Sequence, residues 1–164
     1  MSGVRWPLPE VPPALPAAGD PGAFGAVRRH DVHTGVDLHC PEGSLVVAIE
    51  PGVVAAVLAF TGSGAGSPWW NDTDAVLVEG SSGVVVYGEV RAAADVRVGT
   101  RVSAGDPLGR VVRVLRHDKG RPMSMLHVEL YAAGVRDPVW WRLGEPMPAG
   151  LCDPTPLLAQ SSSS

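Results

Sequence analysis

Short runs of apolar, β-branched residues alternate with turn residues along most of this chain. Runs of this length and composition are typical of β-strands, and their close spacing favours strands joined by tight turns. The clearest runs lie at 45–50, 53–60, 75–79, 84–90, 108–116 and 125–131. The pattern therefore predicts an all-β fold, an antiparallel sandwich or half-barrel.

The composition supports this prediction. Gly and Pro account for 20 and 16 residues of 164, and only 18% of residues are charged. So many helix breakers leave little room for helices of ordinary length. We expect glycine-rich turns between short strands rather than long solvated helices.

The two ends of the chain differ from its middle. Residues 1–22 are rich in Pro and Ala and are expected to form an extended, poorly ordered arm, and residues 159–164 read as a disordered tail. The length suits a single domain, which we place at 23–158. A metal-floored groove is expected in this domain once the site residues below are considered.

Charge and hydropathy exclude some partners. The net charge is −4 and the 13 basic residues are scattered, so no basic stripe is available for nucleic acid. The chain has no run of 18 apolar residues, so no membrane-spanning segment is predicted.

The N-terminus lacks a basic region followed by an apolar run, which a secretory signal would have. The expected location is therefore cytoplasmic by default, with access to the cell wall by another route left open. The oligomeric state is unknown.

The chain has two cysteines, Cys40 and Cys152, and neither belongs to a C-x-x-C pair. A thiolate zinc site is therefore not indicated. The two thiols could pair in an oxidising compartment or remain as buried thiols, and the sequence leaves both open.

The first candidate site is the segment HTGVD, from His33 to Asp37. On a β-strand these two residues and Gly35 would point to one face, because alternate residues share a face. Glycine at the centre lets a metal ion or substrate approach the backbone. A histidine paired with an aspartate on the surface is the simpler alternative.

The second candidate is MLHVELY, in which Leu126, Val128 and Leu130 alternate with Met125, His127 and Glu129. The apolar set is expected to face the core, which directs His127 to the opposite side. With His33 and Asp37, it would complete a set of two histidines and one carboxylate. Three protein ligands with an open fourth position are typical of a catalytic zinc site.

Two further segments carry marked residues. VVVYGEV is predicted to place Tyr87 and Glu89 on one strand face, although an edge-strand charge would also explain Glu89. Trp69 and Trp70 lie in a stretch rich in Gly, Ser and Pro, where they could line a groove or cap the core beneath a loop.

Together these motifs resemble the lysostaphin-type zinc metalloendopeptidases of peptidoglycan, over roughly residues 22–156. The order of the motifs is far more specific than any one of them. The matching pieces are Phe24-Gly25, His33 to Leu38, Glu42 to Ser44, Val47-Ala48, Pro51 to Val54, Val86 to Gly88, Val98 to Val102, Ala104 to Asp106, Leu108-Gly109, His127 to Glu129 and Asp153-Pro154.

The resemblance implies one zinc ion held by His33, Asp37 and His127, with a peptidoglycan peptide or another peptide as partner. This chain also differs from the family pattern at two positions. The family has a catalytic histidine where this chain has Met125, and usually another where it has Glu89. A thioether is only a weak hydrogen-bond acceptor and cannot replace the first histidine.

Two functions follow. The first is a zinc metalloendopeptidase that hydrolyses peptidoglycan cross-links with Glu89 as substitute general base, since zinc proteases can use a glutamate for this task. The second is an inactive zinc-binding pseudopeptidase that binds cell-wall peptides or a protein partner. Glu129 and Met125 are expected beside the metal site, with Tyr87, Trp69 and Trp70 as groove residues.

A third hypothesis is that the chain is a lipoyl or biotinyl carrier domain. The Gly–Val rhythm of residues 95–111 and the lone Lys119 are similar to those of such domains. A carrier domain is shorter, however, and has no need of the three metal-ligand residues.

Overall fold

The computed structural model describes residues 3–117, 120 and 123–163. In this part of the chain nine strands are followed by one helix, α1 (Thr155–Ser161), with a single 3-10 turn, η1 (Ser63–Ala65). The strands are β1 (Val36–His39), β2 (Leu45–Val47), β3 (Gly52–Thr61), β4 (Thr73–Gly80), β5 (Gly83–Ala92), β6 (Arg101–Val102), β7 (Pro107–Val111), β8 (Met125–Tyr131) and β9 (Leu151–Cys152).

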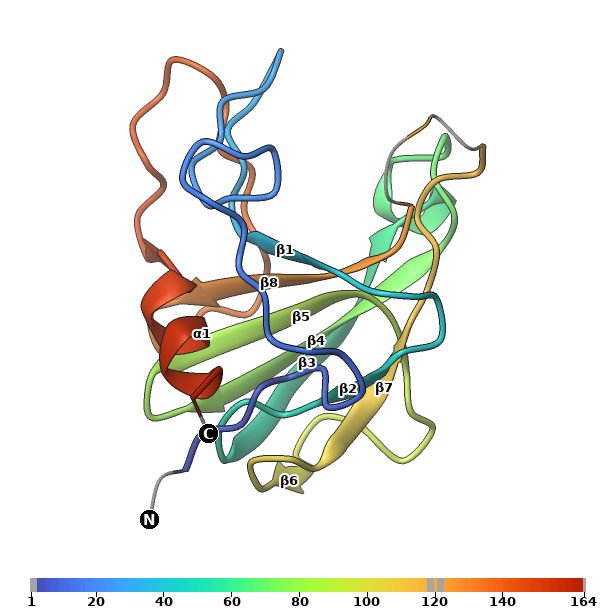
Figure 1. Cartoon of the computed structure of the whole chain (residues 1–164), viewed down its shortest axis with the longest axis vertical. Coiled ribbons are helices and arrows are strands. Elements are labelled where there is room, and N and C mark those ends of the chain that lie inside the picture. Colours follow the sequence, from blue (N-terminus) through green and yellow to red (C-terminus); the bar gives the residue numbers. More distant parts are fainter. Residues whose placement is uncertain (1–2, 118–119, 121–122, 164) are drawn as a thin grey trace.

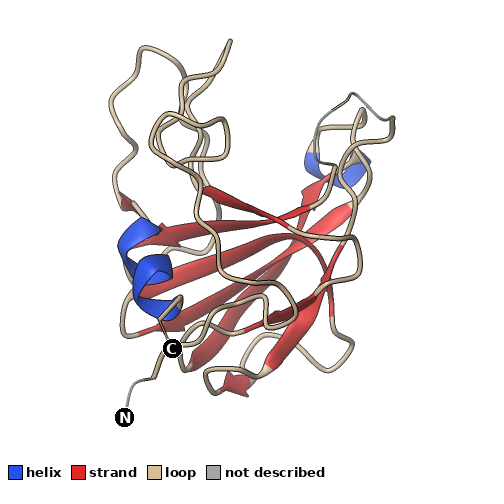
Figure 2. Ribbon diagram, viewed as in Figure 1, coloured by secondary structure: helices blue, strands red, loops and turns tan. Residues whose placement is uncertain are grey.

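All nine strands belong to one antiparallel sheet that does not close on itself (Figures 1 and 2). Its main path runs β1-β8-β5-β4-β3-β6, with β7 joined to β5 and β2, and β9 joined to β8. The all-β, antiparallel fold predicted from the sequence is confirmed. In the described residues no helix is long and apolar enough to cross a membrane.

The central strands are buried on both faces, as their continuous apolar runs predict. Val85 and Tyr87 of β5 join the larger core cluster, whereas Val84 and Val86 join a smaller cluster on the opposite face. Alternate residues of a strand point to opposite faces, so β5 contributes to both clusters. Two covered faces explain why this strand shows little polar alternation.

The N-terminal segment is not wholly the poorly ordered arm expected from its composition. Val4, Trp6 and Leu8 are buried in the larger core cluster. The Arg5 N–H donates to the Ile49 carbonyl at 2.7 Å, which fastens the backbone beside the sheet. Alternating apolar residues among the prolines give this segment a buried face, which its Pro and Ala content hid.

The C-terminal residues also differ from expectation. Helix α1 continues to Ser161, and Leu157, Leu158 and Ser161 are buried. The predicted tail therefore begins inside a helix that packs on the core. The boundaries proposed for a single domain at 23–158 stay a prediction.

The register of β8 separates the two cysteines. Cys40 follows His39, whose partner on β8 is Met125, whereas Cys152 pairs with Leu130. Five residues along a strand span roughly 16 Å, and a disulfide requires Cα atoms within about 7 Å. The two thiols of one chain therefore do not pair.

A bulge interrupts β5 at Glu89. On β4, Asp74 pairs with Val90 and Ala75 with Gly88, so Glu89 has no partner there. Its φ of 66° is the only positive φ of a non-glycine residue in the described part of the chain. The bulge lies where β5 exchanges its neighbour β8 for β7.

This bulge changes where Tyr87 and Glu89 point. Tyr87 is fully buried in the larger core cluster, where its hydroxyl accepts a hydrogen bond from the Ile49 N–H at 2.8 Å. The prediction that Tyr87 lines a groove on the face of Glu89 is therefore wrong, because an extra residue in a strand disturbs the simple alternation of sides.

Replacing Tyr87 with Phe tests this assignment. The change leaves the buried Ile49 N–H without its acceptor, so we expect the free energy of unfolding to fall by roughly 1–3 kcal/mol. Denaturant titration measures the loss. Metal content is expected to stay at the wild-type level, and a variant as stable as the wild type would contradict this account.

Candidate metal centre

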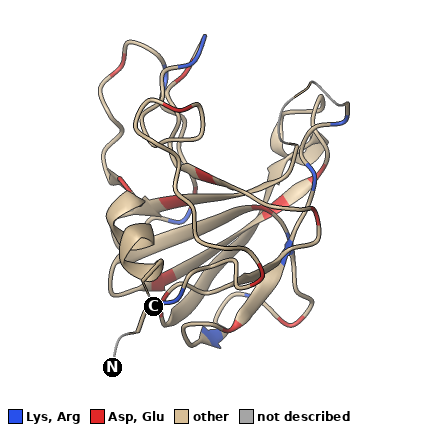
Figure 3. Ribbon diagram, in the orientation of Figure 1, with Lys and Arg blue, Asp and Glu red and all other residues tan. Residues whose placement is uncertain are grey.

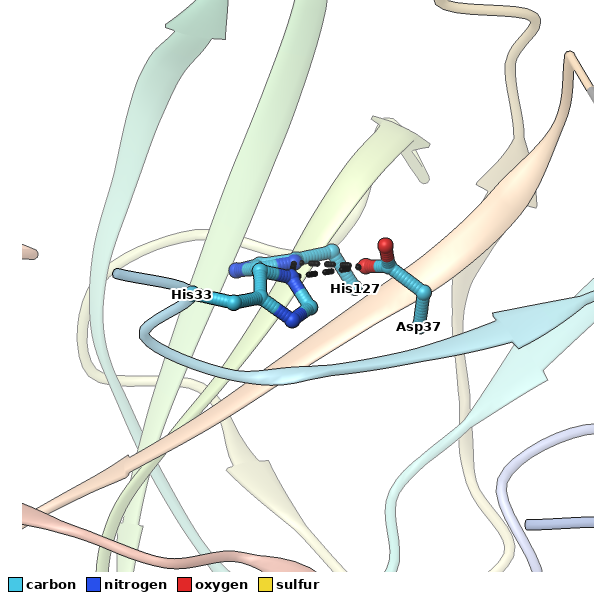
Figure 4. Close-up of side chains that lie close together, drawn as sticks. All are labelled: His33, Asp37 and His127. Atoms are coloured by element: carbon cyan, nitrogen blue, oxygen red, sulfur yellow. Dashed lines mark hydrogen bonds and ion pairs between the residues drawn. The ribbon is translucent and has the colours of Figure 1, made fainter. Parts of the chain in front are cut away.

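Three side chains from distant parts of the sequence converge on one point. His127 Nδ1 lies 2.8 Å from Asp37 Oδ1, and His33 Nε2 lies 3.3 Å from each of these two atoms. Figure 4 shows dashed lines from both rings meeting at the same oxygen of Asp37. The three residues are only 4–8% exposed.

The pairing of β1 with β8 accounts for two members of this group. Asp37 is the direct partner of His127 in the antiparallel register. Partners of this kind have neighbouring Cβ atoms on the same face of the sheet. The imidazole and the carboxylate are therefore adjacent as a consequence of strand register.

The position of His33 in the chain differs from the prediction. It lies before β1, in an irregular segment, and not on the same strand as Asp37. The chain bends at Gly35, where an added Cβ would lie 2.4 Å from the Val128 carbonyl oxygen. Only glycine permits this close approach of the two backbones, which returns the His33 ring to Asp37.

The second nitrogen of each imidazole is held by a hydrogen-bond acceptor. His33 Nδ1 lies 3.0 Å from the Ala23 carbonyl oxygen, and His127 Nε2 lies 2.7 Å from Glu129 Oε2. If these nitrogens donate, His33 Nε2 and His127 Nδ1 keep their lone pairs toward Asp37. This outer hydrogen bonding is typical of histidines that bind metals.

The spacing of the three ligand atoms fits a tetrahedral metal ion. Zn–N and Zn–O bonds of about 2.0–2.1 Å imply ligand atoms separated by roughly 3.3 Å in a tetrahedron. The observed separations are 2.8, 3.3 and 3.3 Å. Two imidazoles and one carboxylate therefore fit a zinc-type ion with one position left open.

Glu129 anchors a hydrogen-bond network behind His127. Its carboxylate accepts hydrogen bonds from the Thr34 hydroxyl at 2.7 Å and the Tyr131 hydroxyl at 2.6 Å. The Tyr131 hydroxyl in turn accepts one from the Val139 N–H at 2.9 Å. The orientation of His127 is thus tied to the segment before β1 and to the loop after β8.

The charges of this buried group are strongly coupled. Burial works against the charged form of Asp37, but hydrogen bonds with His127 and His33 lower its pKa overall. Burial also opposes the charged form of His127, yet Asp37 and Glu129 hold its pKa well above the ordinary value. Hydrogen bonding with His127 likewise lowers the pKa of Glu129 despite burial.

Glu89 carries a second unusual carboxylate near the ligands. The residue is partly exposed, but its Oε1 is buried without a hydrogen-bond partner in the described part of the chain. Burial raises the pKa of Glu89 to about 7, with opposing contributions from the charges of His127 and Asp37. A strained backbone and an unpaired carboxylate oxygen are features found at functional sites.

Two residues at the site escaped the sequence analysis. The Phe60 ring lies 5.4 Å from the His127 ring, centre to centre, over Gly88, where a Cβ would come within 2.8 Å of the phenyl carbon Cε2. Arg28 Nη2 lies 3.8 Å from Asp37 Oδ2. The sequence carried no signal for either residue, because folding alone brings Phe60 over Gly88 and Arg28 to Asp37.

Other predicted residues lie outside the ligand group. Met125 is half-buried at the start of β8, on the strand face of His127. Trp69 is 62% exposed, and its ring makes an edge contact with that of Trp70, 6.0 Å away. The groove roles of the tryptophans and the groove itself stay predictions. Lys119 lies outside the described residues.

The family assignment follows from comparison with known proteins. A family model described as Peptidase family M23 matches residues 31–138, which is well over half of the chain and includes His33, Asp37 and His127. The chain belongs to peptidase family M23. Membership of this family indicates a metallopeptidase-like domain related to peptidoglycan hydrolases. No match was found among the curated proteins.

Solved structures support the fold. A putative peptidase M23 from Pseudomonas aeruginosa is similar with a TM-score of 0.55 and 17% identity, over 95% of this chain and 50% of that one. A mutant catalytic domain of the prophage-encoded M23 protein EnpA from Enterococcus faecalis gives 0.54 and 22%, over 86% and 95%. This M23 domain spans half the length of the first structure and nearly all of the second.

Changing Glu129 to Gln tests the outer partner of His127. Glutamine keeps the shape but loses the charge, so we expect metal affinity to fall by about 10–100-fold. A competition titration with a metal-binding dye measures this. The control is Glu145→Gln, an exposed carboxylate in the loop after β8. Equal affinity in Glu129→Gln and wild type would contradict the role of Glu129.

Proposed function

We propose that this M23 domain is a zinc endopeptidase that hydrolyses peptide bonds in peptidoglycan cross-links, with Glu89 as its general base. The convergence of His33 Nε2, Asp37 Oδ1 and His127 Nδ1 at tetrahedral spacing carries this proposal. Such a set leaves room for water or substrate, as catalytic zinc sites do.

When bound, zinc would polarise the peptide carbonyl and acidify a water molecule. The protein supplies the remaining functions. Glu129 keeps the Nε2 proton of His127 in place, which directs the Nδ1 lone pair to the metal position. Phe60 covers one side of the His127 ring and limits its contact with water.

Glu89 supports proton transfer by its position and environment. Its pKa of about 7 is raised chiefly by burial, and the charges of His127, Asp37, Arg28 and Glu129 act on it. The free Oε1 would accept a proton from the attacking water and deliver it to the leaving amine. Water thereby adds across the peptide bond, giving a carboxylic acid and an amine.

The second candidate function is a pseudopeptidase that binds zinc and peptide without cleavage. The observation favouring it is Met125, on the strand face of His127 at the position where the resemblance puts a catalytic histidine. A thioether cannot transfer a proton or donate a hydrogen bond to an oxyanion. Of the two positions at which the family has catalytic histidines, the one at Glu89 alone keeps a group that can transfer a proton.

Replacing Glu89 with Gln separates the two functions. We expect the release of soluble fragments from purified peptidoglycan to slow by about 10²–10⁴-fold, because the general base is lost while the metal ligands remain. Zinc content, measured by elemental analysis, is expected to be unchanged. Glu145→Gln again serves as the surface control.

The pH profile completes this experiment. A base works only when deprotonated, so wild-type turnover should rise with pH through an apparent pKa at or below about 7, since a bound cation lowers the pKa of Glu89. This rise is expected to disappear in Glu89→Gln. Unchanged turnover in the variant would remove Glu89 from the mechanism, and zinc-loaded wild type that binds but never cleaves peptidoglycan would favour the pseudopeptidase.

A further inference from the structure

Arg28 is held at the edge of the metal centre by a tight turn. Its N–H donates to the Asp31 carbonyl at 2.8 Å, and Val27 and Val32 form an antiparallel bridge on either side of this turn. The Leu143 N–H donates to the His30 carbonyl at 3.2 Å, which fastens the turn to the loop after β8. The backbone of Arg28 is therefore fixed relative to Asp37.

The guanidinium group of Arg28 is only partly used. Its Nη2 donates to the Pro21 carbonyl at 3.3 Å and lies 3.8 Å from Asp37 Oδ2, which is too long for a hydrogen bond. In the part of the chain that the structure describes, Nη1 and Nε of Arg28 have no hydrogen-bond partner. The side chain is 42% exposed, compared with 10% for Asp37.

Asp37 does not form a bidentate ion pair with the guanidinium group of Arg28. Its Oδ1 is directed at both histidines, and only Oδ2 faces Arg28. A cation held by Asp37 would take up the charge of that carboxylate, leaving Arg28 with uncompensated positive charge. A half-exposed guanidinium whose Nη1 and Nε have no partner among the described residues is suited to a second carboxylate.

We propose that Arg28 forms a carboxylate-binding subsite beside the metal centre, so that this domain prefers peptides with a free carboxylate close to the cleaved bond. The inference rests on the proposed function for its link to cleavage, but carboxylate binding itself does not require turnover. Figure 3 shows basic and acidic residues interspersed over the molecule, so general attraction to one basic face would not explain such a preference.

Matched peptides test this subsite. One pair is acetyl-tetraalanine with a free C-terminus and its C-terminal amide, and the other carries an internal glutamate or glutamine and ends in an amide. Each is assayed with zinc-loaded wild type, Arg28→Gln, Arg28→Lys and Arg29→Gln. Arg29 is the matched control, since it is exposed in the same turn, and the ion pairs found at Asp37 involve Arg28, His33 and His127 instead. The two pairs distinguish a terminal from a side-chain carboxylate.

Binding is measured by calorimetry and cleavage by amine release. Charge-assisted hydrogen bonds at a half-exposed site lead us to expect about tenfold preference of wild type for the acid in at least one pair. Arg28→Gln should lose this preference through KM and Kd, not kcat. Arg28→Lys should retain part of it, and Arg29→Gln all of it, with zinc content unchanged throughout.

Three results would overturn the subsite: wild type that binds acids and amides equally, Arg28→Gln that keeps the preference, or Arg28→Gln that loses zinc or weakens both members of a pair alike. The last would make Arg28 a partner that merely orients Asp37. If no peptide is cleaved but wild type alone binds the acid more tightly, the subsite stands while the proposed peptidase activity fails.

Discussion

The register in which β1 pairs with β8 is the constraint on which the metal centre depends. It sets Asp37 opposite His127, and the close approach at Gly35 then returns His33 to the same point. A slip of one residue would move the side chains of β1 to the other face of the sheet. Buried apolar partners, Val36 with Val128 and Leu38 with Leu126, hold the register against such a slip.

Buried charge is the second property that unites the site. Asp37, Glu129 and the Oε1 of Glu89 are all withdrawn from water, and the guanidinium of Arg28 lies near Asp37. Burying several carboxylates is costly unless opposite charge compensates them. In this protein the raised pKa values of His127 and Glu89 reduce the negative charge, and a divalent cation would do so more completely.

The loops connect this centre to the surface. In Figure 1 the loop that precedes β1 and the loop that follows β8 rise together on one side of these strands, while the segment after β3 rises on the other. Glu129, which is hydrogen-bonded to His127, joins both of the first two loops to it, through Thr34 before β1 and through Tyr131 and Val139 after β8. The orientation of the His127 ring is thus coupled to both of these loops.

Part of this arrangement could be predicted from the sequence. Runs of β-branched residues indicated six of the strands, and the motif order indicated which two histidines and which aspartate to consider. Strand alternation failed at Glu89, because a bulge depends on how β5 changes neighbours and not on its own residues. Arg28 and Phe60 could not be foreseen either, since a turn and a glycine-sized gap bring them to the site only after folding.

The N-terminal segment shows that composition alone also fails to predict burial. Its prolines suggested disorder, yet Trp6 and Leu8, on either side of Pro7, are buried in the core. Composition averages over a segment, whereas burial depends on which individual residues find a partner. Tyr87, expected beside Glu89 in a groove, packs in the interior for a different reason, which is the bulge that interrupts the alternation of β5 at Glu89.

X-ray absorption at the zinc edge, on purified protein loaded with one equivalent of zinc, tests the central claim most directly. The account predicts a four-coordinate ion with two imidazole nitrogens and one carboxylate oxygen at about 2.0–2.1 Å, and one further light-atom ligand. A spectrum with sulfur ligands, with a single imidazole, or identical in wild type and His127→Ala would contradict it.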